Sequence, residues 1–168
     1  MALSAISVSN TDHFAKGGVK ILTLGTFDGT ASFTAAANHG VTHVAAADAV
    51  TIDFEKETCK ITSSTSQEKG LAMTTVSVEC YIPKISGVKY ASLEAMKGEA
   101  LYAQAELWDG SSIILGWDNV LGGTGTAGTD FGLFLESIES DSGAALADQN
   151  GVTLKLTGVQ GEEPRTVA

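Results

Sequence analysis

The sequence predicts an all-β domain that is mainly antiparallel, a sandwich or barrel with one short packed helix, hairpins and extended loops. Several stretches alternate apolar and polar residues with a period of two, which is typical of half-buried strands. Asp-Gly and Asn-Gly dipeptides, which favour tight turns, punctuate these stretches. One short stretch, residues 92–98, has the residues typical of a helix and its ends. With 168 residues, the chain is expected to form one domain over residues 1–168.

The first predicted strand runs from Val19 to Thr26 and is followed by the turn signal Asp28-Gly29. Residues 31–49 are rich in alanine, and their pattern leaves open a loop with short strand pieces or a frayed helix. From Asp48 onward the alternation of a strand is clear. Its apolar face is expected to carry Val50, Ile52 and Phe54, and its polar face Thr51, Asp53 and Glu55.

Two further strands are expected before the helix. Residues 58–63 form the first, residues 63–70 form an exposed polar loop or hairpin tip, and residues 71–82 form the longest strand before a proline. Cys59 and Cys80 both fall on apolar strand faces. Because they lack Cys-x-x-Cys spacing, we expect buried, reduced thiols that contribute to packing.

The helix is predicted over Ser92–Lys97. Ser92 is a suitable N-cap, Leu93 and Met96 share one face, and Gly98 suits the end of the helix. A helix this short is not stable alone, so we expect it to pack against the sheet.

A hairpin follows the helix. The dipeptide Asp109-Gly110 predicts its turn, and the second strand covers residues 112–117. In the first strand Leu101, Ala103, Ala105 and Leu107 are expected on one face, with Tyr102, Gln104, Glu106 and Trp108 on the other.

The last third of the chain begins with a glycine-rich loop over residues 121–129. Two strands are then expected over residues 131–140 and 152–159, paired in an antiparallel manner. Both ends of the chain are expected to lie outside the packed domain, as a flexible N-terminal arm over about residues 1–18 and a polar, mobile C-terminal tail over about residues 160–168.

The charge of the chain is one-sided. The 20 acidic residues outnumber the 10 lysines and arginines, which gives a net charge of −10 and argues against binding of a phosphate backbone. No lysine or arginine stands between Lys97 and Lys155, so the acids there have no basic partner within their own stretch. These acids are Glu99, Glu106, Asp109, Asp118, Asp130, Glu136, Glu139, Asp141 and Asp148.

No membrane association is expected. The N-terminus lacks the positively charged region of a secretory signal, and no run approaches the roughly 18 apolar residues of a membrane span. We therefore expect a soluble protein made in the cytoplasm.

The motifs for catalysis and cofactor binding are weak. The glycine-rich loop has no Gly-Lys-Ser/Thr, so a phosphate cradle is not indicated. His39 and His43 are four residues apart but have no third ligand nearby in sequence, and no Gly-x-Ser-x-Gly elbow is present. We expect no enzyme activity, no cofactor and no metal. An aromatic platform for a carbohydrate stays open, formed by Trp108, Trp117, Tyr102 and Tyr81.

The second half of the chain resembles the tail tube proteins (major tail proteins) of tailed bacteriophages. The resemblance covers about 75 residues: the short helix, the Asp109-Gly110 hairpin, the run from Phe131 to Gly143, and the strand from Val152 that leads to Glu162-Glu-Pro164. It implies a β-sandwich or barrel with a packed helix and no active site. It also implies a virion location, hexameric rings that stack into a tube, contacts with other tail proteins, and transient, non-specific passage of DNA.

The acidic stretch is consistent with such a channel, because carboxylates repel phosphate whereas lysines or arginines would bind it. On strand parity we predict that Glu106 lines the lumen, with Gln104, Asp53 and Glu136 as neighbours. Other virion parts stay open as alternatives, namely a capsid decoration, a tail terminator or a connector. Outside virion structure, the alternative is a carbohydrate-binding or adhesin module.

Overall fold

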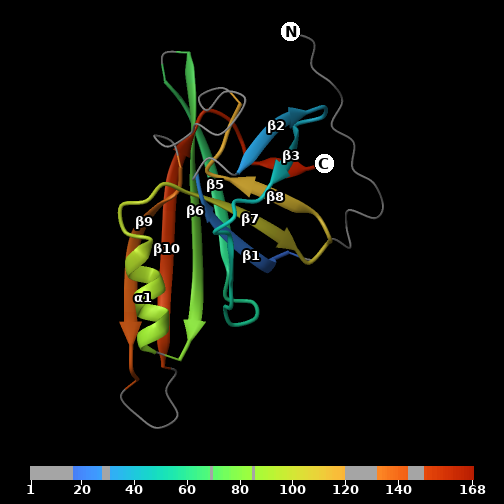
Figure 1. Ribbon diagram of the computed structural model, residues 1–168. Coiled ribbons are helices and arrows are strands. Elements are labelled where there is room, and N and C mark those ends of the chain that lie inside the picture. The colour runs from blue at the N-terminus through green and yellow to red at the C-terminus, as the bar shows by residue number, and fades with distance from the viewer. Residues whose placement is uncertain (1–16, 28–30, 69, 85, 120–131, 144–149) are drawn as a thin grey trace.

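The computed structural model describes residues 17–27, 31–68, 70–84, 86–119, 132–143 and 150–168. Strands account for 58% of it, and the described residues contain one short helix, which confirms the predicted all-β fold. The strands form a seven-stranded mixed sheet, called sheet A, and a four-stranded antiparallel sheet, called sheet B. Figure 1 shows the helix α1 beside sheet A, lying over β9 and β10 of sheet B.

Sheet A has the strand order β2-β3-β11-β8-β7-β1-β4. Residues 31–49, whose structure the sequence left open, contribute the antiparallel hairpin of β2 and β3. The predicted hairpin around Asp109-Gly110 joins β7 to β8. The strands of sheet A are β1 (Val19–Thr26), β2 (Ser32–Ala36), β3 (Gly40–Val44), β4 (Val50–Ile52), β7 (Leu101–Leu107), β8 (Ser112–Leu115) and β11 (Arg165–Val167).

Sheet B has the order β5-β6-β10-β9, and the predicted pairing of its last two strands is confirmed. Of the two readings of residues 63–70, the loop is wrong and the hairpin is confirmed, although its strands are longer than expected, since β5 pairs with β6 as far as Glu68↔Leu71. This end of the hairpin extends beyond the rest of sheet B (Figure 1). The β5 side chains in this part, from Ser63 to Gln67, are polar on both faces, so the alternation that reveals a strand is missing there. The strands are β5 (Lys60–Glu68), β6 (Leu71–Pro83), β9 (Phe134–Asp141) and β10 (Gly151–Gln160).

The helix begins earlier than predicted. Helix α1 spans Gly87–Ala95, and the Oγ of its N-cap Ser86 accepts a hydrogen bond from the amide of Lys89. Ser92, the predicted cap, lies inside the helix, where its hydroxyl donates to the carbonyl of Val88 at 3.2 Å. The helix does pack on the sheets, as expected, through the buried side chain of Leu93.

The main core lies between the two sheets. It is lined by the inward-facing residues of β1 and β7 from sheet A, those of β6 and β10 from sheet B, and α1. Cys59 and Cys80 lie in this core as buried, unbridged thiols, as predicted. A hydrogen bond with Cys80, together with burial, raises the pKa of the Cys59 thiol. A thiol in such a setting behaves as a packed core group.

A second core lies on the other face of sheet A. Tyr102 on β7 is completely buried there, and its ring centroid is 5.1 Å from that of Phe33 on β2. Those strands are four places apart in the sheet order, which in a flat sheet corresponds to about 19 Å. Sheet A therefore curls around this second core, and β7 is buried on both faces at its beginning.

The C-terminal tail was expected to be mobile, and this expectation is wrong. Residues Arg165–Val167 form β11, which pairs in parallel with β3 and antiparallel with β8. This short strand joins the β2–β3 hairpin to the rest of sheet A. A buried ion pair anchors it, because Arg165 donates to both carboxylate oxygens of Glu162, at 2.7 and 2.8 Å, and to the carbonyl of Gly40 at 3.0 Å.

Hydrogen bonds also link the polar groups around β11. The carboxylate of Glu162 accepts a bond from the amide of Asn119, and buried Asp118 accepts one from the amide of Gly161 at 2.6 Å. Gln160 is completely buried, and its side-chain oxygen accepts from the amide of Gly116. The end of β10 is thus bonded to the segment after β8. Such hydrogen bonds satisfy buried polar groups that would otherwise be costly.

Candidate functional site

The outer face of sheet B is a broad polar surface. Along β6 and β10 the inward side chains are buried valine, leucine, isoleucine and cysteine, so by strand parity their neighbours point away from the core. Hydroxyl side chains dominate that outer face. Its polar members are Lys60, Thr62, Ser64 and Ser66 on β5, Thr75, Ser77, Glu79 and Tyr81 on β6, Thr153, Lys155 and Thr157 on β10, and Glu136, Ser137 and Glu139 on β9. Its apolar members are Met73 on β6, Val159 on β10 and Phe134 on β9.

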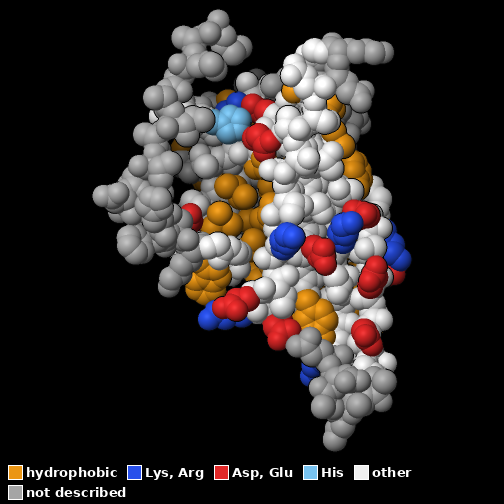
Figure 2. Space-filling model, turned by 180° about the vertical axis from the view of Figure 1, so that it is seen from behind, with side chains coloured by type: hydrophobic (Ala, Val, Ile, Leu, Met, Phe, Trp, Pro, Cys, Tyr) orange, Lys and Arg blue, Asp and Glu red, His pale blue; other side chains and the backbone are white. Residues whose placement is uncertain are grey.

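The charges on this face are arranged in pairs. Glu79 stands directly opposite both Lys60 and Lys155 in the strand register, and the ammonium of Lys155 lies 2.8 Å from the carboxylate of Glu136. The hydrogen bond that Lys155 donates to Glu136 raises the pKa of Lys155, supported by the charges of Glu136, Glu79 and Glu139. Figure 2 shows acidic and basic groups side by side across this largely uncharged face. Each lysine therefore has acidic neighbours, and acids are in slight excess.

Both edges of sheet B are long. β5 has nine residues and β9 has eight, and among the described residues no other strand pairs along the outer side of either one. The edge strand β5 carries no charged residue from Ile61 to Gln67. Free edge strands with neither charge nor proline can pair with strands of other chains. The edge strands of sheet A are shorter, with five residues in β2 and three in β4.

The structure separates the four residues predicted to line a lumen. Glu136 lies on β9 at the outer face of sheet B, whereas Gln104 and Glu106 lie on β7 of sheet A, on the face turned away from the main core. Asp53 is exposed and follows β4 at the edge of sheet A. Gln104 and Glu106 are thus brought together, while Glu136 stands on the opposite layer of the sandwich.

Two of the acids from the lysine-free stretch have basic partners from elsewhere in the chain. Glu106 pairs with Lys20 on the neighbouring strand β1 at 2.5 Å, and Glu136 pairs with Lys155. Asp118 is 98% buried and bonds to backbone, so it serves the fold. Strand pairing across the sheets supplies the partners that the local sequence lacks. Asp130 and Asp148 lie outside the described residues.

The two histidines in the described part of the chain, His39 and His43, have separate partners. His39 sits in the turn between β2 and β3 and donates from Nε2 to the carbonyl of Glu163 at 2.8 Å, while His43 stacks on Phe33 at 4.8 Å between ring centroids. Burial lowers the pKa of His43, although a hydrogen bond with Gln104 opposes the shift. In the part of the chain that the structure describes, no three His, Cys, Asp or Glu side chains are grouped as metal ligands.

The aromatic side chains do not form one exposed platform. Tyr102 and Trp117 are buried in the second core, where Trp117 stacks on Phe33. Trp108 is 38% exposed and lies under the ammonium of Lys56 on another part of sheet A. Tyr81 lies across Gly151 on sheet B, where an added Cβ would come within 2.4 Å of its ring. The four residues therefore lie in three separate parts of the structure: the second core, the surface beside Lys56, and sheet B.

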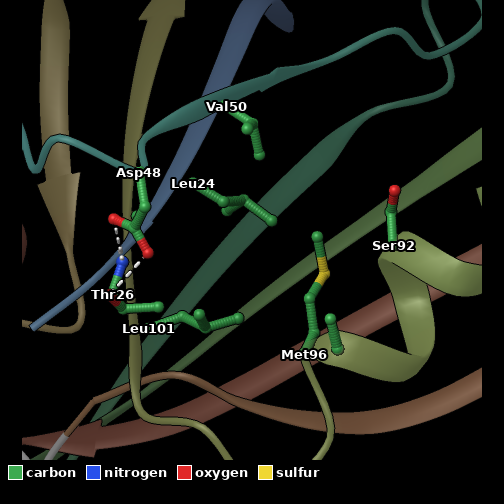
Figure 3. A pocket seen from close by; sticks show the side chains of 9 residues that line it. Leu24, Thr26, Asp48, Val50, Ser92, Met96 and Leu101 are labelled. Atoms are coloured by element: carbon green, nitrogen blue, oxygen red, sulfur yellow. Dashed lines mark hydrogen bonds between the residues drawn. The ribbon is translucent and has the colours of Figure 1, made fainter. Parts of the chain in front are cut away.

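A groove lies between the edge strand β4 and α1. Figure 3 shows Val50 and Leu24 on one side of it, with Ser92 and Met96 of α1 across from them. Two adjoining cavities of about 270 and 210 Å³ make up the groove, and both are lined by Val50, Ser92 and Met96. At one end Asp48 accepts a hydrogen bond from the hydroxyl of Thr26 at 2.7 Å. The lining is mostly apolar, and it offers no arrangement of nucleophile and base.

Sequence reasoning missed most of the outer face of sheet B. The sequence offered no period-two signal on β5, because residues 62–66 are an unbroken run of hydroxyl residues, Thr-Ser-Ser-Thr-Ser. The glycine-rich loop over residues 121–129, and residues 1–16 of the arm predicted over about residues 1–18, lie outside the described residues. Among the described helices none has the length and apolarity needed to cross a membrane. Comparisons with protein-family models, with curated proteins and with solved structures find no match to this chain.

Proposed function

We propose that this protein is the subunit of a viral tail tube, in which copies join edge to edge through sheet B and the polar outer face of that sheet lines a channel for DNA. The observation that carries the proposal is the combination in sheet B of two long free edges, of which β5 is uncharged from Ile61 to Gln67, with one face rich in hydroxyl groups. The resemblance in the second half of the chain supports the same function.

The edges explain how rings would form. If β5 of one copy pairs with β9 of the next, the two contacting surfaces differ, and repetition of this head-to-tail contact closes a ring. Sheet B of every copy then has no free edge, as in a closed barrel. The uncharged run from Ile61 to Gln67 presents no electrostatic obstacle to that pairing.

The width of such a ring suits a DNA duplex. Six copies, the number that the resemblance implies, would contribute four strands each and make a barrel of 24 strands. With strands about 4.8 Å apart and tilted by about 40°, the barrel would be roughly 45–50 Å across between backbones. Side chains narrow this space but leave room for a duplex.

The chemistry of the face suits passage rather than binding. Tight binding of DNA requires lysines or arginines that neutralise phosphates and release counterions. Here Lys60 and Lys155 face Glu79 across the strands, and Lys155 also pairs with Glu136, so neither lysine is available alone. Hydroxyl groups and a slight excess of acid complete a surface to which phosphate does not adhere.

This arrangement changes which residues are proposed to line the lumen. Glu136 remains, and it is joined by Glu79 and Glu139 on the same face. Glu106 and Gln104 belong to sheet A, on the far side of the sandwich core, and in the proposed tube they lie away from the channel. Asp53, at the edge of sheet A, is likewise outside the proposed lining.

Electron microscopy of the purified protein tests assembly directly. We expect rings that stack into tubes. Rings that never stack would instead indicate a terminator or connector, and a protein that stays monomeric at high concentration, even with a nucleating tail fraction, would contradict the proposal.

Two single substitutions by proline test the role of the β5 edge. Successive N–H groups of a strand point to opposite edges, so of Ser63→Pro and Ser64→Pro one removes a donor toward β6 and the other removes a donor at the free edge. The free-edge variant should keep the wild-type circular dichroism spectrum and fail to assemble. Normal tubes from that folded variant would refute edge pairing through β5.

A charge reversal tests the lining. Tubes of Glu139→Lys should retain duplex DNA in co-sedimentation at low salt, with retention that falls as salt rises, because each ring gains a circle of lysines. Glu94→Lys on the exposed face of α1 is the matched control and should behave like wild type. Equal DNA retention by the two variants would show that the outer face of sheet B does not line the channel.

A further inference from the structure

The two cysteines face one another across neighbouring strands of sheet B. Lys60, the first residue of β5, pairs with Glu79 of β6 in an antiparallel register. The preceding residue, Cys59, therefore lies opposite Cys80. Both side chains are buried in the main core, with 5% and 1% of their surface exposed, so they point to the same side of the sheet. A hydrogen bond joins the two thiols.

The chain just before Cys59 keeps this alignment with β6. The hydroxyl of Thr58 lies 3.4 Å from the carbonyl of Tyr81, the residue that follows Cys80. Directly opposed residues of an antiparallel pair have Cα atoms about 4.5–5.5 Å apart, within the range of about 4.4–6.8 Å that a disulfide requires. Their Cβ atoms, about 4.5–5.5 Å apart, need approach by only about 1 Å. The backbone thus holds the two sulfurs where a bond can form.

The start of β5 gives a small oxidant a route to the thiols. β5 is an edge strand, and an exposed turn at Lys56 and Glu57 lies just before it, with a positive φ of 68° at Glu57. Strand ends at a sheet edge open locally without global unfolding. Because Cys59 and Cys80 are in contact, an opening that lifts Cys59 from β6 uncovers both sulfurs, and reclosure brings them together again.

We propose that Cys59 and Cys80 form an oxidation site that reacts with a hydroperoxide and closes into a cross-strand disulfide. In the opened state one thiol gives up its proton and its sulfur attacks an oxygen of hydrogen peroxide. The O–O bond breaks, and the products are a sulfenic acid and water. On reclosure the second sulfur attacks the first, and its proton leaves with the hydroxyl group as a second water. Two thiols are oxidised and one peroxide is reduced to two waters.

The bond fixes the start of the edge strand β5 to its neighbour. It closes a loop that consists of the β5–β6 hairpin, which restricts the unfolded chain and prevents the local opening of β5. In the reduced state the same side chains pack as core groups, so the fold needs no rearrangement to accept the bond. This inference does not depend on the proposed function, since it concerns two side chains of one copy.

Peroxide treatment of the folded, full-length protein tests the site. After incubation with hydrogen peroxide, removal of the peroxide by catalase, and denaturation, the free thiols should fall from two to none and return with dithiothreitol. A tryptic digest should contain residues 57–60 joined to residues 70–84. Thiols that persist, sulfinic acids in place of the link, or covalent dimers only would overturn the proposal.

A relocated cysteine is the matched control. The variant Cys59→Ala/Ile61→Cys again has two thiols on the inner face of β5 and β6. Residue 61 pairs with Val78, however, so it lies diagonally from Cys80 at about 7 Å between Cβ atoms, beyond the reach of a disulfide. We expect no linked peptide from this variant. Equal yields of the disulfide in the two proteins would refute the argument from register.

Hydrogen exchange tests the effect of the bond on β5. The β5 amides that bond to β6 should exchange about tenfold or more slowly in the disulfide form, because the start of the strand no longer opens. Peroxide-treated Cys59→Ala is the control and should exchange like the untreated variant. Equal exchange in the reduced and disulfide forms of the wild type would contradict the proposed restraint on β5.

Discussion

The ion pair between Arg165 and Glu162 should be the largest single polar contribution to holding the C-terminal strand in place. In Arg165→Met the aliphatic packing is largely kept, but both hydrogen bonds to Glu162 and the bond to the carbonyl of Gly40 are lost. The Glu162 side chain is 15% exposed, so its charge would be left mostly buried without a cation.

The structure sets the size of this effect. Breaking a buried ion pair destabilises by about 3–5 kcal/mol, and hydrogen bonds to charged groups contribute about 1.5–3 kcal/mol each. Water reaches part of Glu162, and the amide of Asn119 continues to bond to it at 2.8 Å. We therefore expect Arg165→Met to lower the free energy of unfolding by about 2–4 kcal/mol, measured by urea denaturation with tryptophan fluorescence as the signal.

The effect should depend on pH. Burial alone would raise the pKa of Glu162, but the hydrogen bond from Arg165, assisted by the amide of Asn119, holds it below its ordinary value. A carboxylate with a lowered pKa in the folded state contributes stability that is complete above its unfolded pKa of about 4.3 and is lost as the pH falls through the lower, folded value. The stability difference between wild type and Arg165→Met should therefore shrink below about pH 4.

A double-mutant cycle makes the reasoning refutable. Glu162→Gln keeps an acceptor for the amide of Asn119 and removes the buried charge, so combining it with Arg165→Met should cost less than the sum of the two single changes. A loss under about 0.5 kcal/mol in Arg165→Met, or full additivity in the cycle, would show that the ion pair does not anchor β11.

Further predictions follow from individual contacts. Gly25→Ala should lower the free energy of unfolding by about 2–3 kcal/mol in a thermal melt, because the new Cβ would lie 2.5 Å from the Tyr102 hydroxyl, which cannot move within the second core. Cys80→Ser should cost about 1–3 kcal/mol in urea denaturation by burying a hydroxyl, and native thiols that alkylate rapidly without denaturant would contradict its burial. Glu106→Lys should keep the fold but lose about 1 kcal/mol, since it replaces an ion pair with a repulsion from Lys20; unchanged stability would contradict the pairing.

Much of the fold could be predicted from the sequence where strands are half-buried. The alternation in β6 and β7 reflects burial of one face against the main core, so it predicted each strand and, for Cys80 and for the alanines of β7, the side that faces inward. It was incomplete for β7, because sheet A curls and buries Tyr102 on the second face as well. A period-two alternation of apolar and polar residues indicates that one face of a strand is buried, but it does not indicate whether the other face is buried as well.

Elements that depend on distant partners could not be predicted. β11 has three residues and forms only because β3 and β8 offer edges far away in the sequence. The β2–β3 hairpin turns at Asn38 and His39, both with positive φ (55° and 58°), and two such residues in an alanine-rich stretch give no clear signal. The helix start was misplaced because Gly87, a poor helix former, occupies its first position.

The candidate site was only partly accessible from the sequence for a related reason. The excess of acid was visible, but the partners that Lys20 and Lys155 provide come from strands paired across the sheets. The strand order decides which of the two sheets has long free edges, and no local sequence pattern encodes that order. The choice between Glu106 and Glu136 as a channel residue therefore requires the topology.

The position of β11 has a consequence for synthesis of the chain. Because β11 lies between β3 and β8, sheet A cannot close until residues 165–167 have been made and are free to fold. Until then β3 and β8 each present an open edge, while sheet B, whose last strand in the sequence ends at Gln160, can already be paired. A chain truncated before Arg165 would thus have an intact sheet B and a divided sheet A, and its open strand edges would be prone to pairing with other chains.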